Sequence, residues 1–219
     1  MKVLVVDTET SGLPEKGNPS IFSETEKWPF IIQLSFILYD TEKNKMITCQ
    51  DHIIKLPDHI HITSESEKIH GITRSISQRK GVSMSLALSD FYVVFLEADI
   101  VVGHNISFDK RMIMVETVRN KEFKEYNKSW VKKREYCTMK NSVDVCRIEV
   151  VNNRGEKYFK YPTLTQLHQY LFKSIPNGTH DAMADVLICL RCYEMVREEK
   201  DICSVGCTFT RNLYKLYCV

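Results

Sequence analysis

The chain lacks any apolar run long enough to cross a membrane, and it has no internal repeat and no low-complexity tract. Its first apolar run, Val3 to Val6, is too short for the hydrophobic region of an export signal. An excess of one charge is also missing, because 30 Lys and Arg residues face 28 Asp and Glu residues and leave a net charge of +2. This balance excludes an overall polycation, so any binding to a polyanion must come from a local basic surface.

The composition that remains is that of an ordinary globular domain. With 219 residues, 43% of them hydrophobic and 26% charged, the chain can form one domain with a proper core, or one domain with a small appendage. Because no export signal or membrane span is visible, we expect an intracellular protein whose eight cysteines are reduced thiols.

Short apolar runs and helical spacings predict an α/β fold. The first three strands are close in sequence and are expected to form an antiparallel meander. The alternation of strand and helix that follows is typical of parallel crossover units. The expected strands are 3–10, 30–39, 46–56, 99–103 and 136–138, and the expected helices are 64–69, 83–98, 105–119, 163–172 and 181–200.

Three other segments have weaker patterns. Residues 143–160 read as a polar loop or a weak hairpin that turns at 152–155, and residues 201–219 show no strong pattern. Residues 119–135 mix basic side chains with Phe123, Tyr126 and Trp130. They could bind phosphates and stack on bases, but a solvated helix face with ion pairs is the favoured interpretation.

Two carboxylates mark the end of the first strand. Asp7 and Glu9 are two residues apart, so they leave the same face of the strand. Alone, such a pair is more often part of a solvated loop. If buried, the two groups would repel each other unless a cation lay between them, and carboxylate oxygens suit Mg²⁺ or Mn²⁺.

Three later residues complete a candidate site. Asp109 lies four residues after Asn105, on one face of the helix that follows a buried strand. His180 and Asp185 would lie ~140° apart on one helix, so they can face one site only if His180 precedes the helix. Four carboxylates and a histidine fit a two-metal phosphodiesterase, with two cations ~4 Å apart and the histidine as general base.

The same residues carry a family resemblance. The chain resembles the DEDDh, or DnaQ-like, 3′→5′ exonucleases, which include the proofreading subunit of bacterial DNA polymerase III and ribonuclease T. The resemblance covers residues 1–199, the expected exonuclease domain, and leaves 200–219 as a C-terminal tail of unknown role. The matching stretches are Asp7-Thr8-Glu9-Thr10-Ser11-Gly12-Leu13, Gly103-His104-Asn105-Ile106-Ser107-Phe108-Asp109 and His180-Asp181-Ala182-Met183-Ala184-Asp185, with Ile69-His70-Gly71-Ile72-Thr73 and Tyr161-Pro162-Thr163-Leu164 as further features.

The resemblance implies a ribonuclease H-like fold, with a mixed five-stranded sheet flanked by helices. It also implies an enzyme that uses two Mg²⁺ or Mn²⁺ ions to release nucleoside monophosphates from a single-stranded or frayed 3′ end. DNA is the favoured substrate. An exoribonuclease and a nucleic-acid-binding scaffold without turnover are the alternatives, and a DNA polymerase is a candidate partner.

The resemblance also assigns roles to residues. Asp7, Glu9, Asp109 and Asp185 would bind metal, and His180 would be the general base. The expected substrate-binding residues are Thr10, Leu13, Ile69, His70, Asn105 and Phe108.

Each substrate-binding assignment has a structural alternative. Leu13, Ile69 and Phe108 could be core residues, His70 could be a hydrogen-bonded structural histidine, and Asn105 could only cap its helix. A zinc site at Cys189 and Cys192 is disfavoured, because their segment reads as an apolar helix.

Overall fold

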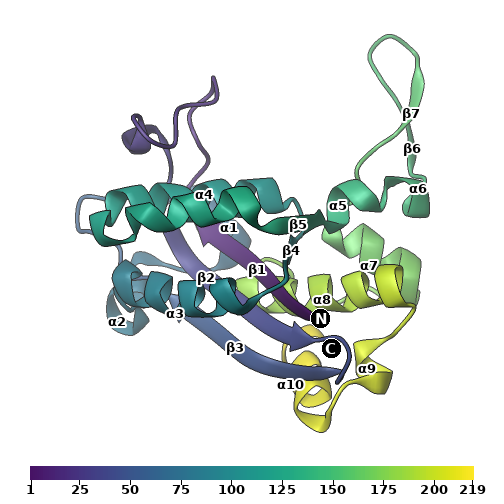
Figure 1. Cartoon of the computed structure of the whole chain (residues 1–219). Coiled ribbons are helices and arrows are strands. Elements are labelled where there is room, and N and C mark those ends of the chain that lie inside the picture. Colours follow the sequence, from purple (N-terminus) through teal and green to yellow (C-terminus); the bar gives the residue numbers. More distant parts are fainter.

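A five-stranded mixed sheet forms the centre of the structure, a computed structural model that describes all 219 residues (Figure 1). β1 (Lys2–Thr10), β2 (Ile31–Asp40) and β3 (Lys45–Ile53) form an antiparallel meander. β4 (Ile100–Gly103) pairs in parallel with β1, and β5 (Arg134–Cys137) pairs in parallel with β4. The strand order β3-β2-β1-β4-β5 confirms the predicted fold class.

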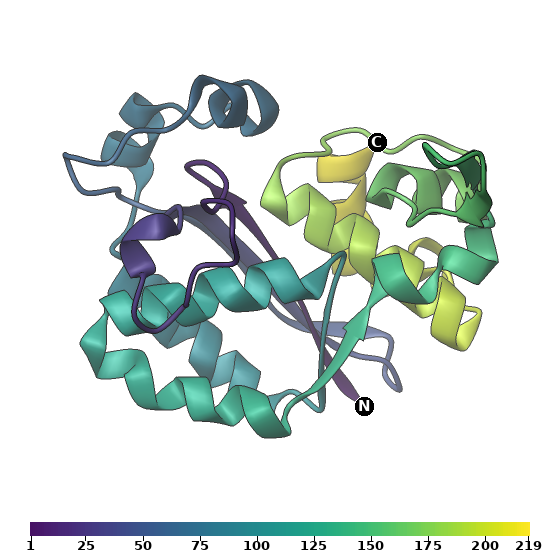
Figure 2. The same cartoon turned by 90° about the horizontal axis from the view of Figure 1, so that it is seen from above.

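Both faces of β1 are covered. Val3 and Val5 belong to one buried cluster, whereas Leu4 and Val6 belong to the other, so alternate side chains enter two different cores. Figure 2 shows the helices in two groups on either side of the sheet. The Leu4 side carries α3 (Met84–Glu97), α4 (Ile106–Arg119) and the 3₁₀ helix η2 (Lys121–Lys132), and the Val3 side carries α7 (Leu164–Phe172) and α8 (Ala182–Glu198).

The basic segment 119–135 is part of the core rather than a free surface. Trp130 is 2% exposed and packs on Phe95, with 4.5 Å between the ring centroids. Tyr126 stacks on Tyr92 at 4.4 Å. Lys128 pairs with the neighbouring Glu125. The aromatic side chains of this segment are therefore packed against α3. Most of its cations are exposed, as the favoured interpretation predicted, but Arg119 pairs with Glu116 and Lys133 Nζ donates to the Phe95 and Ala98 carbonyls at 2.6 Å.

Residues 201–219 form two helices, although the sequence pattern predicted none. In α9 (Ile202–Val205) and α10 (Thr208–Cys218), the buried side chains of Ile202, Tyr214 and Cys218 join the core around α8. A four-residue helix is too short to show a period. In α10 the buried stripe consists of Tyr and Cys rather than Leu or Ile, which hides the helical signal.

A two-stranded ribbon lies outside the main sheet. β6 (Glu149–Val151) and β7 (Lys157–Phe159) pair antiparallel, and Gly155 takes a positive φ of 80° in the turn between them. This confirms the weak hairpin predicted for residues 143–160. Figure 1 shows the ribbon projecting from the body on the same side as the long loop after β1.

The remaining elements are short. α1 ends at Gly71 in the left-handed conformation, as its sequence predicted. All eight cysteines are free thiols, and Cys189 and Cys192 are buried in α8 as small hydrophobic residues. None of the helices has both the length and the hydropathy needed to span a membrane. The other elements are η1 (Thr25–Lys27), α1 (Ser64–His70), α2 (Arg74–Lys80), α5 (Thr138–Asn141) and α6 (Val143–Cys146).

Candidate active site

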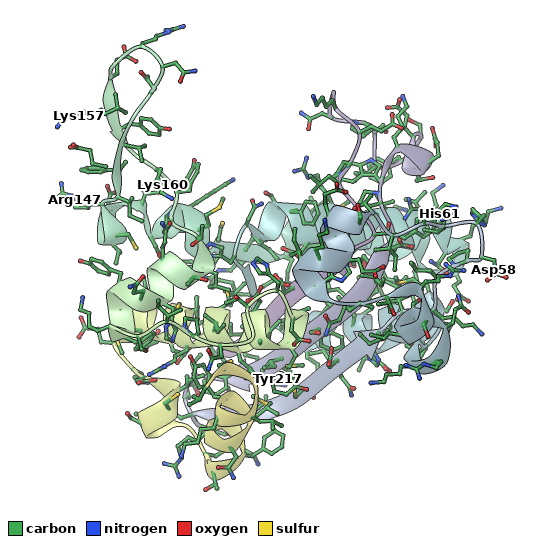
Figure 3. All side chains as sticks on the ribbon, turned by 180° about the vertical axis from the view of Figure 1, so that it is seen from behind. Asp58, His61, Arg147, Lys157, Lys160 and Tyr217 are labelled. Carbon is green, nitrogen blue, oxygen red and sulfur yellow. The ribbon has the colours of Figure 1, made fainter.

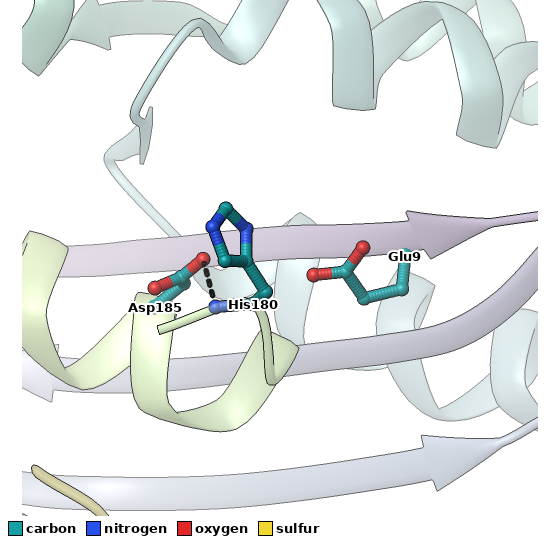
Figure 4. A group of neighbouring side chains, drawn as sticks. All are labelled: Glu9, His180 and Asp185. Carbon is teal, nitrogen blue, oxygen red and sulfur yellow. Dashed lines mark hydrogen bonds between the residues drawn. The ribbon is translucent and has the colours of Figure 1, made fainter. Parts of the chain in front are cut away.

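Three of the predicted site residues come together at the end of β1. One potential ligand atom from each of Glu9, His180 and Asp185 lies within 4.8 Å of the other two, although the residues come from three separate segments (Figure 4). This is the one group of acidic, histidine and cysteine side chains in the structure that could hold a metal ion by this measure.

The start of α8 sets the positions of His180 and Asp185. His180 precedes the helix, with a positive φ of 72°, and its backbone N–H donates to Asp185 Oδ2 at 3.2 Å. Asp181 caps the helix by accepting from the Ala184 N–H at 3.0 Å. As predicted, the histidine is on a loop and the carboxylate is on the helix, and this arrangement allows both to face Glu9.

Gln33 connects this helix start to the sheet. It lies opposite Glu9 in the β1–β2 ladder and is 1% exposed. Its side chain accepts from the Ala182 N–H at 3.1 Å and donates to Asp181 Oδ2 at 3.2 Å and to Asp51 Oδ1 at 2.9 Å. Since every polar atom of this amide is used, the first turn of α8 is fixed relative to β2.

Asp109 and Asp7 lie beside the three-residue group. Asp109 Oδ1 accepts from the Thr8 N–H at 3.0 Å and from Thr8 Oγ1 at 2.8 Å, so α4 is tied to the end of β1. Neither aspartate belongs to the group of Glu9, His180 and Asp185, whose ligand atoms lie within 4.8 Å of one another. Their charges are nevertheless close enough to act on each other and on Glu9 and Asp185.

The four carboxylates hold protons more tightly than usual. Burial and, after it, repulsion by Asp185 and Asp109 together raise the pKa of Glu9 to about 8. Burial is also the main reason that the pKa values of Asp109 and Asp185 rise to about 7. The pKa of Asp7 lies well above its usual value, because Asp7 is buried and faces Asp109, Asp185 and Glu9.

These observations test whether a metal ion fits the site. Asp185 Oδ1 is buried and has no hydrogen-bond partner. The cluster contains several carboxylates and no lysine or arginine among the charges that act on them. Buried charges of one sign require compensation, and a set of carboxylate oxygens suits a hard divalent cation. The residues therefore fit Mg²⁺ or Mn²⁺.

A cavity of about 430 Å³ opens next to Glu9. Leu13 and Ile69 are 83% and 56% exposed at its rim, so neither is the core residue that the structural alternative required. Phe108 is half-buried and packs partly on the core. The cavity is lined by Thr8, Glu9, Thr10, Gly12, Leu13, Thr63, Glu65, Ser66, Ile69, His70 and Phe108.

The polar residues predicted for substrate contact are placed differently. Thr10 donates its hydroxyl to the Gly12 carbonyl at 2.7 Å, and His70 Nδ1 accepts from the Ile72 N–H at 3.0 Å, so both also hold loops of the cavity. Asn105 is outside the cavity lining. It is the left-handed residue that precedes α4, and its Oδ1 accepts from Ser107 Oγ at 3.1 Å.

His104 has a structural environment. Its ring nitrogens lie 3.0 Å from Thr138 Oγ1 and 3.1 Å from the Pro162 carbonyl oxygen, and burial lowers its pKa to about 4. A neutral, doubly hydrogen-bonded imidazole joins the loop before α4 to the segment that follows the hairpin.

The loop that carries His180 is also held by the end of α10. The Asn177 N–H donates to the Cys218 carbonyl at 3.1 Å. Gly178 has a positive φ of 71°, and a Cβ at this position would lie 2.3 Å from the Tyr217 carbonyl oxygen. The close approach of the two backbones therefore requires glycine.

Sequence reasoning missed several residues of this region. Thr8 lies between the two predicted metal ligands Asp7 and Glu9 in the sequence, and this position could have predicted that Thr8 belongs to the site. Gln33, Thr63 and Ser66 gave no signal, because their roles depend on strand register and on how α1 lies against the loop after β1.

Comparisons with known proteins agree with this geometry. A family model described as "Exonuclease" matches residues 4–193. No curated protein matches the chain significantly. Among solved structures, E. coli exonuclease I in complex with a 5cy-dT13 oligonucleotide has a TM-score of 0.63 and 20% identity, over 98% of this chain and 42% of that chain.

Exonuclease I from Methylocaldum szegediense has a TM-score of 0.62 and 19% identity, over 92% of this chain and 42% of that chain. At these identities the likeness shows the fold, and the chain spans about two fifths of the length of the exonuclease I chains. The family model covers most of the residues, and the chain therefore belongs to the exonuclease family, as a member with the DEDDh, or DnaQ-like, motifs.

Proposed function

We propose that the chain is a divalent-metal-dependent 3′→5′ exonuclease that releases nucleoside monophosphates from single-stranded or frayed DNA. The observation that carries this proposal is the convergence of Glu9, His180 and Asp185 beside a cavity rimmed by exposed apolar side chains. Family membership supports the reaction class.

Each group has a role in this proposal. Asp7, Glu9, Asp109 and Asp185 would hold two Mg²⁺ or Mn²⁺ ions, which supply positive charge to the phosphate that is cleaved. His180 would accept the proton of the attacking water, because the imidazole of histidine titrates near neutral pH. Its exposed position on a loop gives it access to that water.

The cavity would hold the terminal nucleotides. Leu13, on the loop after β1, and Ile69, in α1, are apolar and exposed, and Phe108 lies on the cavity wall. Exposed apolar and aromatic side chains can wedge between bases or stack on them. Thr10 and His70 would shape the cavity by holding its loops, and Asn105 would act at its edge.

DNA is the proposed substrate because the similar exonuclease I structures contain dT13 and dA16 oligonucleotides. The presence of all five DEDDh residues argues against a scaffold without turnover. A polymerase partner and an intracellular location stay predictions.

A comparison of substrates tests the proposal. Single-stranded DNA, duplex DNA with a mismatched 3′ end and RNA, each labelled at the 5′ end, are incubated with Mg²⁺ or with EDTA. We expect progressive shortening of the DNA strands with Mg²⁺ and none with EDTA. Cleavage that persists in EDTA, or internal cuts in a circular single strand, would contradict the function, and faster shortening of RNA would favour the exoribonuclease.

His180 provides the test of mechanism. His180→Ala should lower kcat by the ~10²–10⁴-fold that is typical of a lost general base, while Mg²⁺ still raises the melting temperature. His104→Ala is the matched control in the same chain, since this histidine is structural and its loss should act on stability more than on kcat. A fully active His180→Ala enzyme would show that another group accepts the proton.

A further inference from the structure

The β6–β7 hairpin combines cations and aromatic rings on an exposed ribbon. Lys157-Tyr158-Phe159-Lys160-Tyr161 is a continuous basic and aromatic run. Tyr158, Phe159 and Tyr161 are 51%, 39% and 56% exposed. None of the residues 149–159 is buried, so these rings are not accounted for by packing in a core.

Aromatic rings lie on both faces of the ribbon. Side chains alternate along a strand, so Lys157 and Phe159 of β7 leave one face, whereas Tyr158 leaves the other. Lys160 lies just beyond β7, and its Nζ donates to Gln166 Oε1 at 2.9 Å. Arg147 lies over the Phe159 ring, with 5.3 Å between the guanidinium carbon and the ring centroid. Figure 3 shows Arg147, Lys157 and Lys160 along the hairpin.

The hairpin has a net positive charge. Arg147, Arg154, Lys157 and Lys160 outnumber its two acidic residues, Glu149 and Glu156. Lys157 pairs with Glu149 at 2.8 Å, whereas Arg154 makes no ion pair and borders a surface hollow that Tyr158 also lines. A cation and an aromatic ring beside one hollow can bind a phosphate and a base of the same strand.

The base of the hairpin is joined to the site. Pro162 follows Tyr161 directly, and its carbonyl oxygen lies 3.1 Å from His104 Nε2. His104 precedes Asn105 and the start of α4, which carries Phe108 and Asp109. The base of the ribbon therefore contacts the segment that leads into α4, the helix that carries two of the proposed site residues.

We infer that the hairpin is a binding arm for single-stranded nucleic acid, which holds the part of the substrate that lies 5′ of the terminal nucleotides. This inference rests on the proposed function for the identity of the strand. Charge complementarity with a polyanion and the three exposed rings favour a nucleic acid strand over a protein partner.

The test compares strand lengths. Two variants are assayed, the single variant Tyr158→Ala and the double variant Arg154→Ala/Lys157→Ala. The substrates are single-stranded DNA of roughly 20 nucleotides and of about four nucleotides, and these two lengths span the range of single-strand site sizes. The loss of one stacked base corresponds to a change of at least about fivefold in binding. We expect the KM for the long strand to rise at least about fivefold more than the KM for the short strand.

Matched controls lie elsewhere on the surface. Lys128→Ala removes a lysine from an exposed Lys–Glu pair on η2, and Phe209→Ala removes a 58% exposed ring from α10. Both should keep wild-type constants with both strands.

Binding without turnover separates this inference from the proposed function. The Kd of a labelled long strand is measured by fluorescence anisotropy in EDTA for the wild type and both hairpin variants. Suppose that the wild type cleaves neither strand but the hairpin variants bind the long strand at least about fivefold more weakly than the wild type does. The proposed exonuclease function is then wrong, and the binding role of the hairpin is supported. The binding role of the hairpin is overturned if the Kd and KM for the long strand are unchanged, or if the constants for both strand lengths change equally. The exposed rings are then assigned to a protein partner.

Discussion

Charged side chains in two regions of this molecule, the end of β1 and the β6–β7 hairpin, have opposite surroundings. At the end of β1, Asp109 is buried, Asp7, Glu9 and Asp185 are half-buried, and all four charges have the same sign. On the hairpin, charges of both signs are exposed and partly paired, as Lys157 and Glu149 are. Exposed pairs contribute little to stability, whereas buried like charges oppose folding.

The difference shows where the fold tolerates an unfavourable arrangement. Repulsion among the carboxylates opposes folding, so their convergence is best explained by what they bind. The hairpin charges neither oppose nor support the fold, so changes there should be visible in substrate binding alone. Four experiments can sharpen or break this contrast.

The largest effect is expected from Asp7→Asn. It removes one repelling charge and one proposed metal ligand together, so activity should fall to background while the metal-free melting temperature rises. The control Glu156→Gln, on the hairpin, should change the free energy of unfolding by less than about 0.5 kcal/mol. A sharp fall in the metal-free melting temperature of Asp7→Asn would instead make Asp7 a structural hydrogen-bonding residue.

The second effect is a pH dependence of the metal-free protein. The folded-state pKa values of Glu9, about 8, and of Asp109 and Asp185, about 7, lie above those of the unfolded chain. The contribution of these carboxyl groups to the free energy of unfolding should be fully present below the ordinary carboxyl pKa and should be lost as pH rises to about 8. In this range the folded chain binds more protons than the unfolded chain, so the free energy of unfolding falls as pH rises.

Denaturant melts of the wild type and of Asp185→Asn between these limits would measure this slope. The comparison removes the effect of Glu194, a buried glutamate in α8 whose pKa burial raises to about 7, since both proteins contain it. Identical slopes in the two proteins would mean that the cluster does not titrate as its burial requires.

The third effect is stabilisation by metal. Mg²⁺ that binds only the folded cluster should stabilise the wild type by ~2.7 kcal/mol at a hundredfold excess over Kd. Asp7→Asn should show a smaller rise in melting temperature, and Arg154→Ala/Lys157→Ala should show the full rise. If the hairpin variant showed no rise in melting temperature with Mg²⁺, the hairpin would affect metal binding, and the two regions would not be independent.

The smallest effect is expected from Tyr158→Ala on stability. Because the ring is half exposed and outside both cores, the free energy of unfolding should change by less than about 0.5 kcal/mol. Trp130→Ala, in the other basic and aromatic segment, should cost ~3–5 kcal/mol, since that ring is buried against Phe95. Urea melts of both variants measure the difference, and similar losses would mean that the hairpin packs as a structural element.

The two basic and aromatic segments also show how far the sequence could predict this molecule. Phe123, Tyr126 and Trp130 recur at helical spacing, so one face of η2 packs all three on the core, with Trp130 buried and the other two partly buried. Tyr158 and Phe159 are adjacent in a ribbon with no layer beneath it, so both stay exposed. Both segments mix basic and aromatic residues, and the period and the presence of a covering layer separate them.

The strands and helices could be predicted because they depend on the local spacing of apolar residues. The gathering of the four carboxylates near the end of β1 could be predicted from short sequence motifs. The separation of His180 from α8 followed from the angle between residues on a helix. The roles of Gln33 and Gly178 could not be predicted, because they depend on contacts with Asp181 and Tyr217 across the fold. The boundary between residues 1–199 and 200–219 stays a prediction.

The contact between Gly178 and the end of α10 has a consequence for the order in which the molecule becomes competent. The carboxylates are placed by β1, α4 and α8, but the loop of His180 takes its shape only when Tyr217 and Cys218 have docked on it. During synthesis, α10 emerges after every other part of the site. Detachment of α10 by local unfolding would therefore release the loop of His180 while the sheet remains intact.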